Sequence, residues 1–179
     1  MMTLKNLRSP ADSTPRAARS VENPIIGVLR TRRAFRVVAM RPIPAGAFIM
    51  GVTGIVTHRP TRFSLQVSAT DHISVPPGLS DAEAMDAFPW RFLNHACEPN
   101  ARISHDQTVV AVRAIMENDE VTFNYNTTEY DMAAPFACQC GTVRCVGVVR
   151  GARHLDAEQL AHLHTLLSPY LVGPASRLS

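Results

Sequence analysis

The sequence predicts one globular domain with a mainly β fold, and three observations lead to this prediction. Short runs rich in Val, Ile and Phe follow one another and are separated by turn residues. Two stretches carry the signals of a helix, and both are short. The length of 179 residues, with 46% hydrophobic and 18% charged residues, is that of one globular domain with a buried core.

The first predicted strands form a hairpin-like series. Residues 25–29 and 35–39 are β-rich runs separated by the arginine-rich residues 30–33. A turn at residues 42–46 precedes a further strand at residues 48–50.

The middle of the chain mixes strands with a helix. Residues 63–67 alternate as a half-buried strand, and residues 71–75 form another that ends at a Pro-Pro-Gly turn. Ser80 can cap a short helix at residues 81–90.

The last predicted elements follow residue 100. Residues 101–104 and 107–113 have the pattern of two strands joined by a short turn. Asp156 can cap a helix, interpreted as a packing element, whose leucines fall on one face: Leu160, Leu163, Leu166 and Leu167.

Residues 94–100 are the candidate functional site. They combine Asn, His, Cys, Pro and Asn side chains directly after an apolar run, where a core segment would carry Leu and Val. Amide, imidazole and thiol groups can bind ligands or metals. The other histidines have no second ligand at a metal-binding spacing and are interpreted as ordinary surface or core residues.

All four cysteines are predicted to form one metal site. Cys138, Cys140 and Cys145 make a C-x-C-x4-C cluster, and Cys97 lies within the candidate site. Four thiolates are the ligand set of a closed tetrahedral zinc site, and Gly141 can fold the loop back onto the metal. Free thiols and disulfides are the alternatives, although Cys138 and Cys140 are too close in sequence to pair comfortably.

Three motifs resemble those of SET-domain proteins. Residues 94–100 match the N-H-x-C-x-P-N signature, and residues 120–125 resemble the second signature, E-(L/I/V)-T-(F/Y)-D-Y. The cysteine cluster is similar to the zinc-binding post-SET tail, whose fourth ligand in that family is the cysteine of the first signature. The resemblance, to the SET-domain lysine methyltransferase family, implies small β-sheets with a pseudo-knot, a zinc-stapled post-SET segment and a short C-terminal helix.

The resemblance divides the chain into four parts. A SET domain is expected at residues 23–135, a post-SET zinc segment at 136–151, and a C-terminal helix and tail at 152–179. Residues 1–22, rich in Ser, Pro, Ala and Arg, are expected to be a flexible arm.

The resemblance also implies roles for single residues. Tyr125 takes the place of the catalytic tyrosine and would orient the amine rather than act as a full base, since its hydroxyl has a pKa of about 10. The cofactor-binding residues implied are Phe35, Arg36, Asn94, His95, Tyr130 and Phe136. For Tyr130 and Phe136, aromatic packing below the cysteine cluster is the alternative to cofactor binding.

The chain departs from the family pattern beside the implied site. Residues 33–46 resemble an R-G-x-G segment whose two glycines approach S-adenosylmethionine, but Ala34 and Arg36 stand in their places. Arg36 then either points to solvent or enters the pocket. Val52 replaces a tyrosine that lines the lysine channel in the family, whereas Asn118 replaces a turn glycine and tolerates its left-handed backbone angles.

The resemblance implies an S-adenosylmethionine-dependent N-methyltransferase with a structural Zn²⁺. We expect it to act on a lysine or other amine of a protein or peptide. The alternatives are a SET-fold enzyme that acts on a small-molecule substrate in specialised metabolism, and a non-catalytic SET-like binding module.

Composition adds expectations about partners and location. A net charge of +3 is too small to argue for direct nucleic-acid binding. With no apolar run of membrane-spanning length and no signal-peptide core, we expect a cytoplasmic protein without membrane association, of unassigned oligomeric state. Arginine supplies 17 of the 18 basic residues and Lys5 is the single lysine, which favours a GC-rich coding genome and a bacterial source.

Overall fold

Small β-sheets build the part of the chain that the computed structural model describes, residues 24–32 and 34–175. The predicted arm at residues 1–22 lies outside the described residues. The strands are β1 (Ile26–Arg30), β2 (Phe35–Ala39), β3 (Phe48–Gly51), β4 (Ile55–Thr57), β5 (Leu65–Gln66), β6 (His72–Ser74), β7 (Asn94–His95), β8 (Ala101–Ile103), β9 (Thr108–Ala111), β10 (Thr122–Phe123), β11 (Phe136–Ala137) and β12 (Val148–Val149). The helices are α1 (Asp81–Ala87), α2 (Ala157–Leu163) and α3 (Pro169–Ala175), with 3-10 turns at Pro89–Phe92, Tyr125–Thr127 and Ala152–His154.

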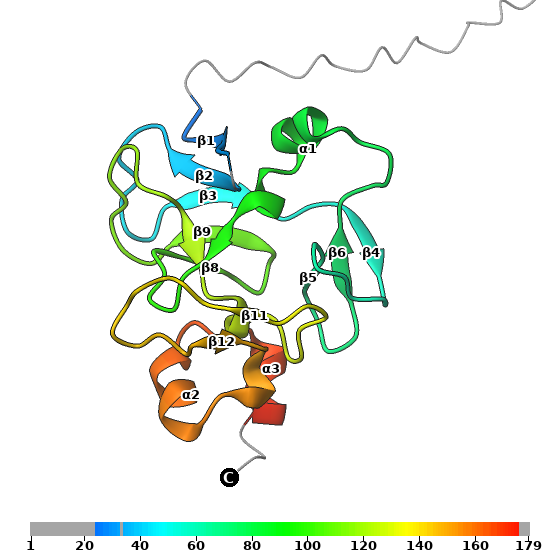
Figure 1. The fold of residues 1–179 in the computed structure, drawn as a ribbon, viewed down its shortest axis with the longest axis vertical. Coiled ribbons are helices and arrows are strands. Elements are labelled where there is room, and N and C mark those ends of the chain that lie inside the picture. The colour runs from blue at the N-terminus through cyan, green and yellow to red at the C-terminus, as the bar shows by residue number, and fades with distance from the viewer. Residues whose placement is uncertain (1–23, 33, 176–179) are drawn as a thin grey trace, which may run out of the picture.

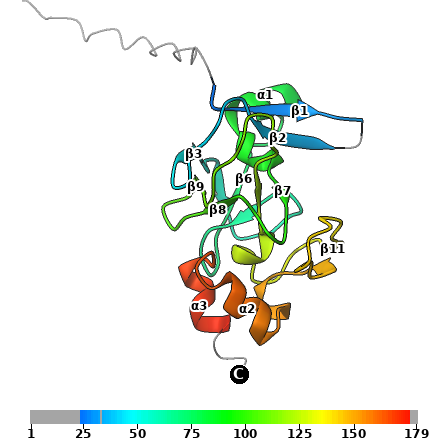
Figure 2. The same ribbon diagram turned by 90° about the vertical axis from the view of Figure 1, so that its left-hand side faces the viewer.

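The described strands pair into five sheets. The pair β1-β2 and the three-stranded sheets β3-β9-β8 and β4-β6-β5 are antiparallel, as is the pair β11-β12. The pair β7-β10 is parallel. The predicted mainly β fold is confirmed, with α2 and α3 together at the end of the molecule away from α1 and β1 (Figures 1 and 2).

A core of branched aliphatic side chains supports the sheets. Ile43 and Ile115 bridge two loops, and Val121 donates its backbone N–H to the carbonyl oxygen of Val37 at 2.8 Å. These side chains are at most 1% exposed, and burying each stabilises the fold by roughly 1.5–3 kcal/mol. The core therefore holds the segment leading to residue 125 against β2.

The first helix begins as predicted and ends early. Ser80 caps α1 in a capping box with Glu83. The predicted extension to residue 90 is wrong, because Pro89 has no backbone N–H to donate and opens a 3-10 turn instead. The predicted strand at residues 63–67 is also shorter in the structure, where it is β5. The hydroxyl of Thr61 accepts the backbone N–H groups of Phe63 and Ser64, so these two residues form a turn before the strand.

The C-terminal segment folds back onto the body of the molecule. Asp156 caps α2 as predicted, but the helix ends at Leu163 and the remaining predicted leucines lie in or after the following turn. The helix α3 was not predicted. The Tyr170 hydroxyl of α3 donates to the carbonyl oxygens of Gln66 at 2.7 Å and Thr128 at 2.9 Å, which ties the tail to β5 and to the segment after β10.

Candidate functional site

The two signature segments lie side by side in the parallel pair β7-β10. Asn94 is opposite Thr122, and His95 is opposite Phe123. Because parallel pairing joins segments that are distant in sequence, it brings Asn94 and His95 next to the chain that leads directly to Tyr125.

The Asn94 side chain joins the segments predicted to hold the cofactor. Its Nδ2 donates to the carbonyl oxygen of Phe35 and to Oε1 of Glu120, both at 2.7 Å. The other carboxylate oxygen of Glu120 lies 3.4 Å from Nε of Arg36. The Arg36 side chain is 57% exposed, so the structure agrees with the solvent-facing alternative.

Tyr125 is held at both its hydroxyl and its backbone. The hydroxyl donates to the carbonyl oxygen of Leu93 at 2.6 Å, and the backbone N–H donates to Nδ1 of His95 at 3.1 Å. Burial, reinforced by the negative charges of Glu120 and Glu129, raises the pKa of the phenol above its ordinary value. Tyr125 is therefore neutral near pH 7, which is the state that an orienting role requires.

Aromatic rings surround Tyr125. Its ring centroid lies 5.3 Å from that of His95, 4.7 Å from that of Phe123 and 5.8 Å from that of Phe136. Burial lowers the pKa of His95 to about 4, so this ring is neutral as well. Phe136 belongs to β11 in the tail, so the tail supplies one wall of the cluster.

Tyr130 is placed differently from the other predicted site residues. The guanidinium carbon of Arg153 lies 5.7 Å from its ring centroid, and its backbone N–H donates to Oε1 of Gln66 at 2.8 Å. Within the described residues its ring makes no ring contact with Tyr125 or Phe136. This placement favours the packing alternative for Tyr130.

The four cysteines meet in one cluster. The sulfur atoms of Cys97 and Cys138 are 3.8 Å apart, close to the edge of about 3.8 Å expected for a tetrahedron with zinc–thiolate bonds of about 2.3 Å. No disulfide joins them, and Gly141 has the predicted positive φ, 69°. The residues therefore fit a zinc ion, since four sulfur ligands lie within 4.8 Å of one another: Cys97, Cys138, Cys140 and Cys145.

Two buried asparagines connect the cluster to the signatures, a role that sequence reasoning missed. Asn124 donates its Nδ2 to the carbonyl oxygen of Cys97 at 3.1 Å. Asn100 accepts the backbone N–H of Thr122 and donates to the carbonyl oxygen of Glu120, each at 2.8 Å. These hydrogen bonds thus join the first signature, which carries Cys97, to the second signature.

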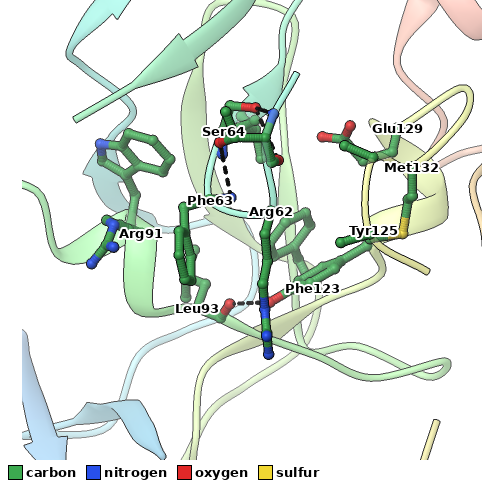
Figure 3. A pocket seen from close by; sticks show the side chains of 14 residues that line it. Arg62, Phe63, Ser64, Arg91, Leu93, Phe123, Tyr125, Glu129 and Met132 are labelled. Atoms are coloured by element: carbon green, nitrogen blue, oxygen red, sulfur yellow. Dashed lines mark hydrogen bonds between the residues drawn. The ribbon is translucent and has the colours of Figure 1, made fainter. Parts of the chain in front are cut away.

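A cavity of about 60 Å³ opens beside Tyr125 (Figure 3). Val52 takes no part in it and is 3% exposed in the core. Of the residues in the cavity wall, the sequence predicted a site role for Tyr125 alone. Phe123 lies in the second signature without a predicted role, and Phe63, Trp90 and Glu129 belong to no motif. The wall of the cavity includes Phe63, Trp90, Leu93, Phe123, Tyr125 and Glu129.

The SET domain family matches residues 34–126, from β2 to the turn that carries Tyr125. The chain therefore belongs to the SET-domain family, as its two signatures predicted.

Two relatives are similar to this chain over part of its length. Methyltransferase flvH of Aspergillus flavus is 32% identical over 123 residues, covering 66% of this chain and 63% of that protein. Histone-lysine N-methyltransferase ash1 of Drosophila melanogaster is 31% identical over 124 residues, covering 62% of this chain and 6% of that protein. The chain thus spans less than two thirds of the length of either relative.

A solved structure shares the fold. The crystal structure of KRYPTONITE in complex with mCHG DNA and SAH superimposes with a TM-score of 0.51 at 23% identity, covering 69% of this chain and 28% of that one. Among the described residues, no helix has the length and apolar character needed to cross a membrane.

Proposed function

We propose that this chain is an S-adenosylmethionine-dependent N-methyltransferase of the SET class that acts on a lysine or other amine of a protein or peptide. The hydrogen bond from the Tyr125 hydroxyl to the carbonyl oxygen of Leu93 carries the proposal, because it orients the phenol beside the two signatures. The relatives named as methyltransferases support it. The SAH in the KRYPTONITE complex supports the cofactor class.

The residues around Tyr125 would position the acceptor amine. When bound, S-adenosylmethionine supplies a methyl group on a positively charged sulfur, and transfer needs a neutral nitrogen in line with it. Because the Tyr125 proton is donated to Leu93, the phenol oxygen can accept an N–H of that amine. This leaves the nitrogen lone pair free to face the methyl group. The residues that would hold the cofactor are Phe35, Arg36, Asn94, His95 and Phe136.

We further propose that residues 136–151 are a post-SET segment that binds one structural Zn²⁺ together with Cys97. Four thiolates leave no coordination position open for water, so the ion would stabilise rather than react. By holding the tail against Cys97, it would keep Phe136 beside Tyr125.

A small-molecule amine is the second candidate acceptor. The buried Val52, in the place of the family's channel tyrosine, favours it because the acceptor passage is not built in the usual way. A cytoplasmic location and a bacterial source are also proposed, from composition alone.

Calorimetry and a methyl-release assay test the function. The purified chain is expected to bind S-adenosylmethionine and to transfer its methyl group to lysine peptides or to free amines, and the preferred acceptor separates the two candidates. Cofactor binding without transfer to any amine would indicate a binding module. No cofactor binding would contradict the proposal.

A further inference from the structure

A carboxylate is buried in the wall of the Tyr125 cavity. Glu129 follows the second signature, is 8% exposed and lines the same cavity as Leu93 and Tyr125. In Figure 3 its carboxylate points toward the side that carries Ser64. Burying a charge without a partner is costly, so the buried carboxyl is stable either with a bound proton or, once ionised, beside a positive partner.

One oxygen of this carboxylate is available to such a partner. Oε1 accepts the backbone N–H of Gln66 at 2.8 Å. Oε2 accepts no hydrogen bond from the described residues, and Nε2 of His72, its nearest cation candidate, is 3.8 Å away. Burial lowers the pKa of His72 and raises that of Glu129 to about 7, so this imidazole does not supply a lasting positive charge.

The rest of the cavity suits the end of an alkylammonium ion. Phe63, Trp90, Phe123 and Tyr125 line it, and aromatic faces attract cations. A volume of about 60 Å³ exceeds the roughly 10–15 Å³ that one water needs. The cavity therefore has room for more than one water-sized group, such as an amino group and the methylene next to it.

Two arginines limit what the rest of the ligand can be. The guanidinium carbons of Arg62 and Arg91 lie 5.7 Å and 4.5 Å from the ring centroid of Phe63, whose side chain is 56% exposed. Neither arginine forms an ion pair with a carboxylate of the described residues. They would repel a second cation on the ligand and attract an anionic group.

We propose that Glu129 binds the acceptor through Oε2 while its amino group is an ammonium ion, before the loss of the proton that methyl transfer requires. The acceptor is then a primary alkylamine whose other end is neutral or anionic. This inference rests on the proposed function and narrows its substrate class. Lysine, free or within a peptide, fits the description, whereas a diamine of similar length does not. Glu129 is thus a substrate-binding residue that selects the charge of the acceptor.

The fluorescence of Trp90, the single tryptophan, reports on this cavity. The full chain, saturated with S-adenosylhomocysteine near pH 8, is titrated with L-lysine, Nα-acetyl-lysine methylamide and cadaverine. At least one lysine probe is expected to bind more tightly than cadaverine. Tighter binding of L-lysine would indicate a free amino acid as the acceptor, and tighter binding of Nα-acetyl-lysine methylamide would indicate a lysine within a peptide. Either outcome supports the proposal.

Glu129→Gln keeps an acceptor oxygen for the Gln66 N–H and removes the charge. It is expected to weaken binding of the preferred lysine probe roughly ten- to hundredfold, whereas Glu117→Gln, which removes an exposed carboxylate, leaves it unchanged. Wild-type affinity in Glu129→Gln, or cadaverine binding as tightly as both lysine probes, overturns the proposal.

A wild-type measurement covers the case in which Glu129→Gln does not fold. Affinity for the lysine probe must rise as the pH passes about 7, where Glu129 ionises, and a flat profile overturns the proposal. These titrations need no methyl transfer. A failure of the methyl-release assay, which would count against the proposed function, is therefore distinguishable from a failure of Glu129 to bind the amine.

Discussion

The hydroxyl of Tyr125 donates a hydrogen bond to the carbonyl oxygen of Leu93 at 2.6 Å, across 32 residues of sequence. The phenol proton is therefore used in a hydrogen bond within the protein, and the phenol oxygen can still accept a hydrogen bond. This geometry distinguishes a positioning phenol from a base, because a base would need a phenol of lowered pKa, whereas burial raises that of Tyr125.

Tyr125→Phe is expected to lower kcat about a hundredfold or more while the affinity for S-adenosylmethionine changes little, because the lost oxygen acts on the amine during transfer. Tyr170→Phe is the matched control, since it also removes a hydrogen-bonded hydroxyl, but one that binds Gln66 and Thr128. The control should lose stability and keep its kcat. Equal losses of kcat in the two variants would contradict the role of Tyr125.

Zinc analysis of the reduced, purified chain is expected to find about one ion per molecule. Cys97→Ser should lose this ion and lower the thermal unfolding midpoint, because metal binding here contributes to folding. Since the ion would hold Phe136 beside Tyr125, cofactor affinity should fall too. A metal-free wild-type protein that folds and binds cofactor normally would rule out the zinc.

Glu129 should make stability depend on pH. Its pKa is about 7 in the folded protein, raised by burial from 4.5, against the opposing effect of the Gln66 hydrogen bond. Between these values the folded protein holds a proton that the unfolded chain releases, so the free energy of unfolding falls as the pH rises and the loss is complete above about 7. The ionisable groups around it are His72, Tyr125 and Tyr170.

Denaturant unfolding of Glu129→Gln, which stays neutral, tests this dependence. The variant should match the wild type near pH 4.5. Near pH 8 it should be more stable by up to about 3 kcal/mol. A difference that does not vary with pH would exclude Glu129 as the source.

Gly151→Ala is expected to destabilise the fold by about 3 kcal/mol or more. Gly151 has a φ of 106°, and an added Cβ would lie 2.5 Å from the carbonyl oxygen of Tyr130. Gly46→Ala is the control, because Gly46 has a φ of 80° with nothing within 4 Å of the added Cβ. It should cost about 1–2 kcal/mol, the backbone strain alone. Equal unfolding midpoints for the two variants would contradict the close contact at Gly151.

The sequence alone was enough to predict the mainly β fold, the family and the cysteine cluster. Each depends on local patterns: strand-like runs, two signatures, and thiols at a metal-binding spacing. Caps also followed from local chemistry, since Ser80 and Asp156 each close a capping box with a residue three positions later.

Only the tertiary structure determined the features that depend on packing between distant segments. It directed Arg36 to solvent beside Glu120, separated Tyr130 from the rings around Tyr125, and set Glu129 against Gln66, 63 residues away. Burial and the direction of a side chain depend on neighbours that the chain brings together over long loops. Single residues such as Glu129 leave no pattern in the sequence from which such neighbours could be predicted.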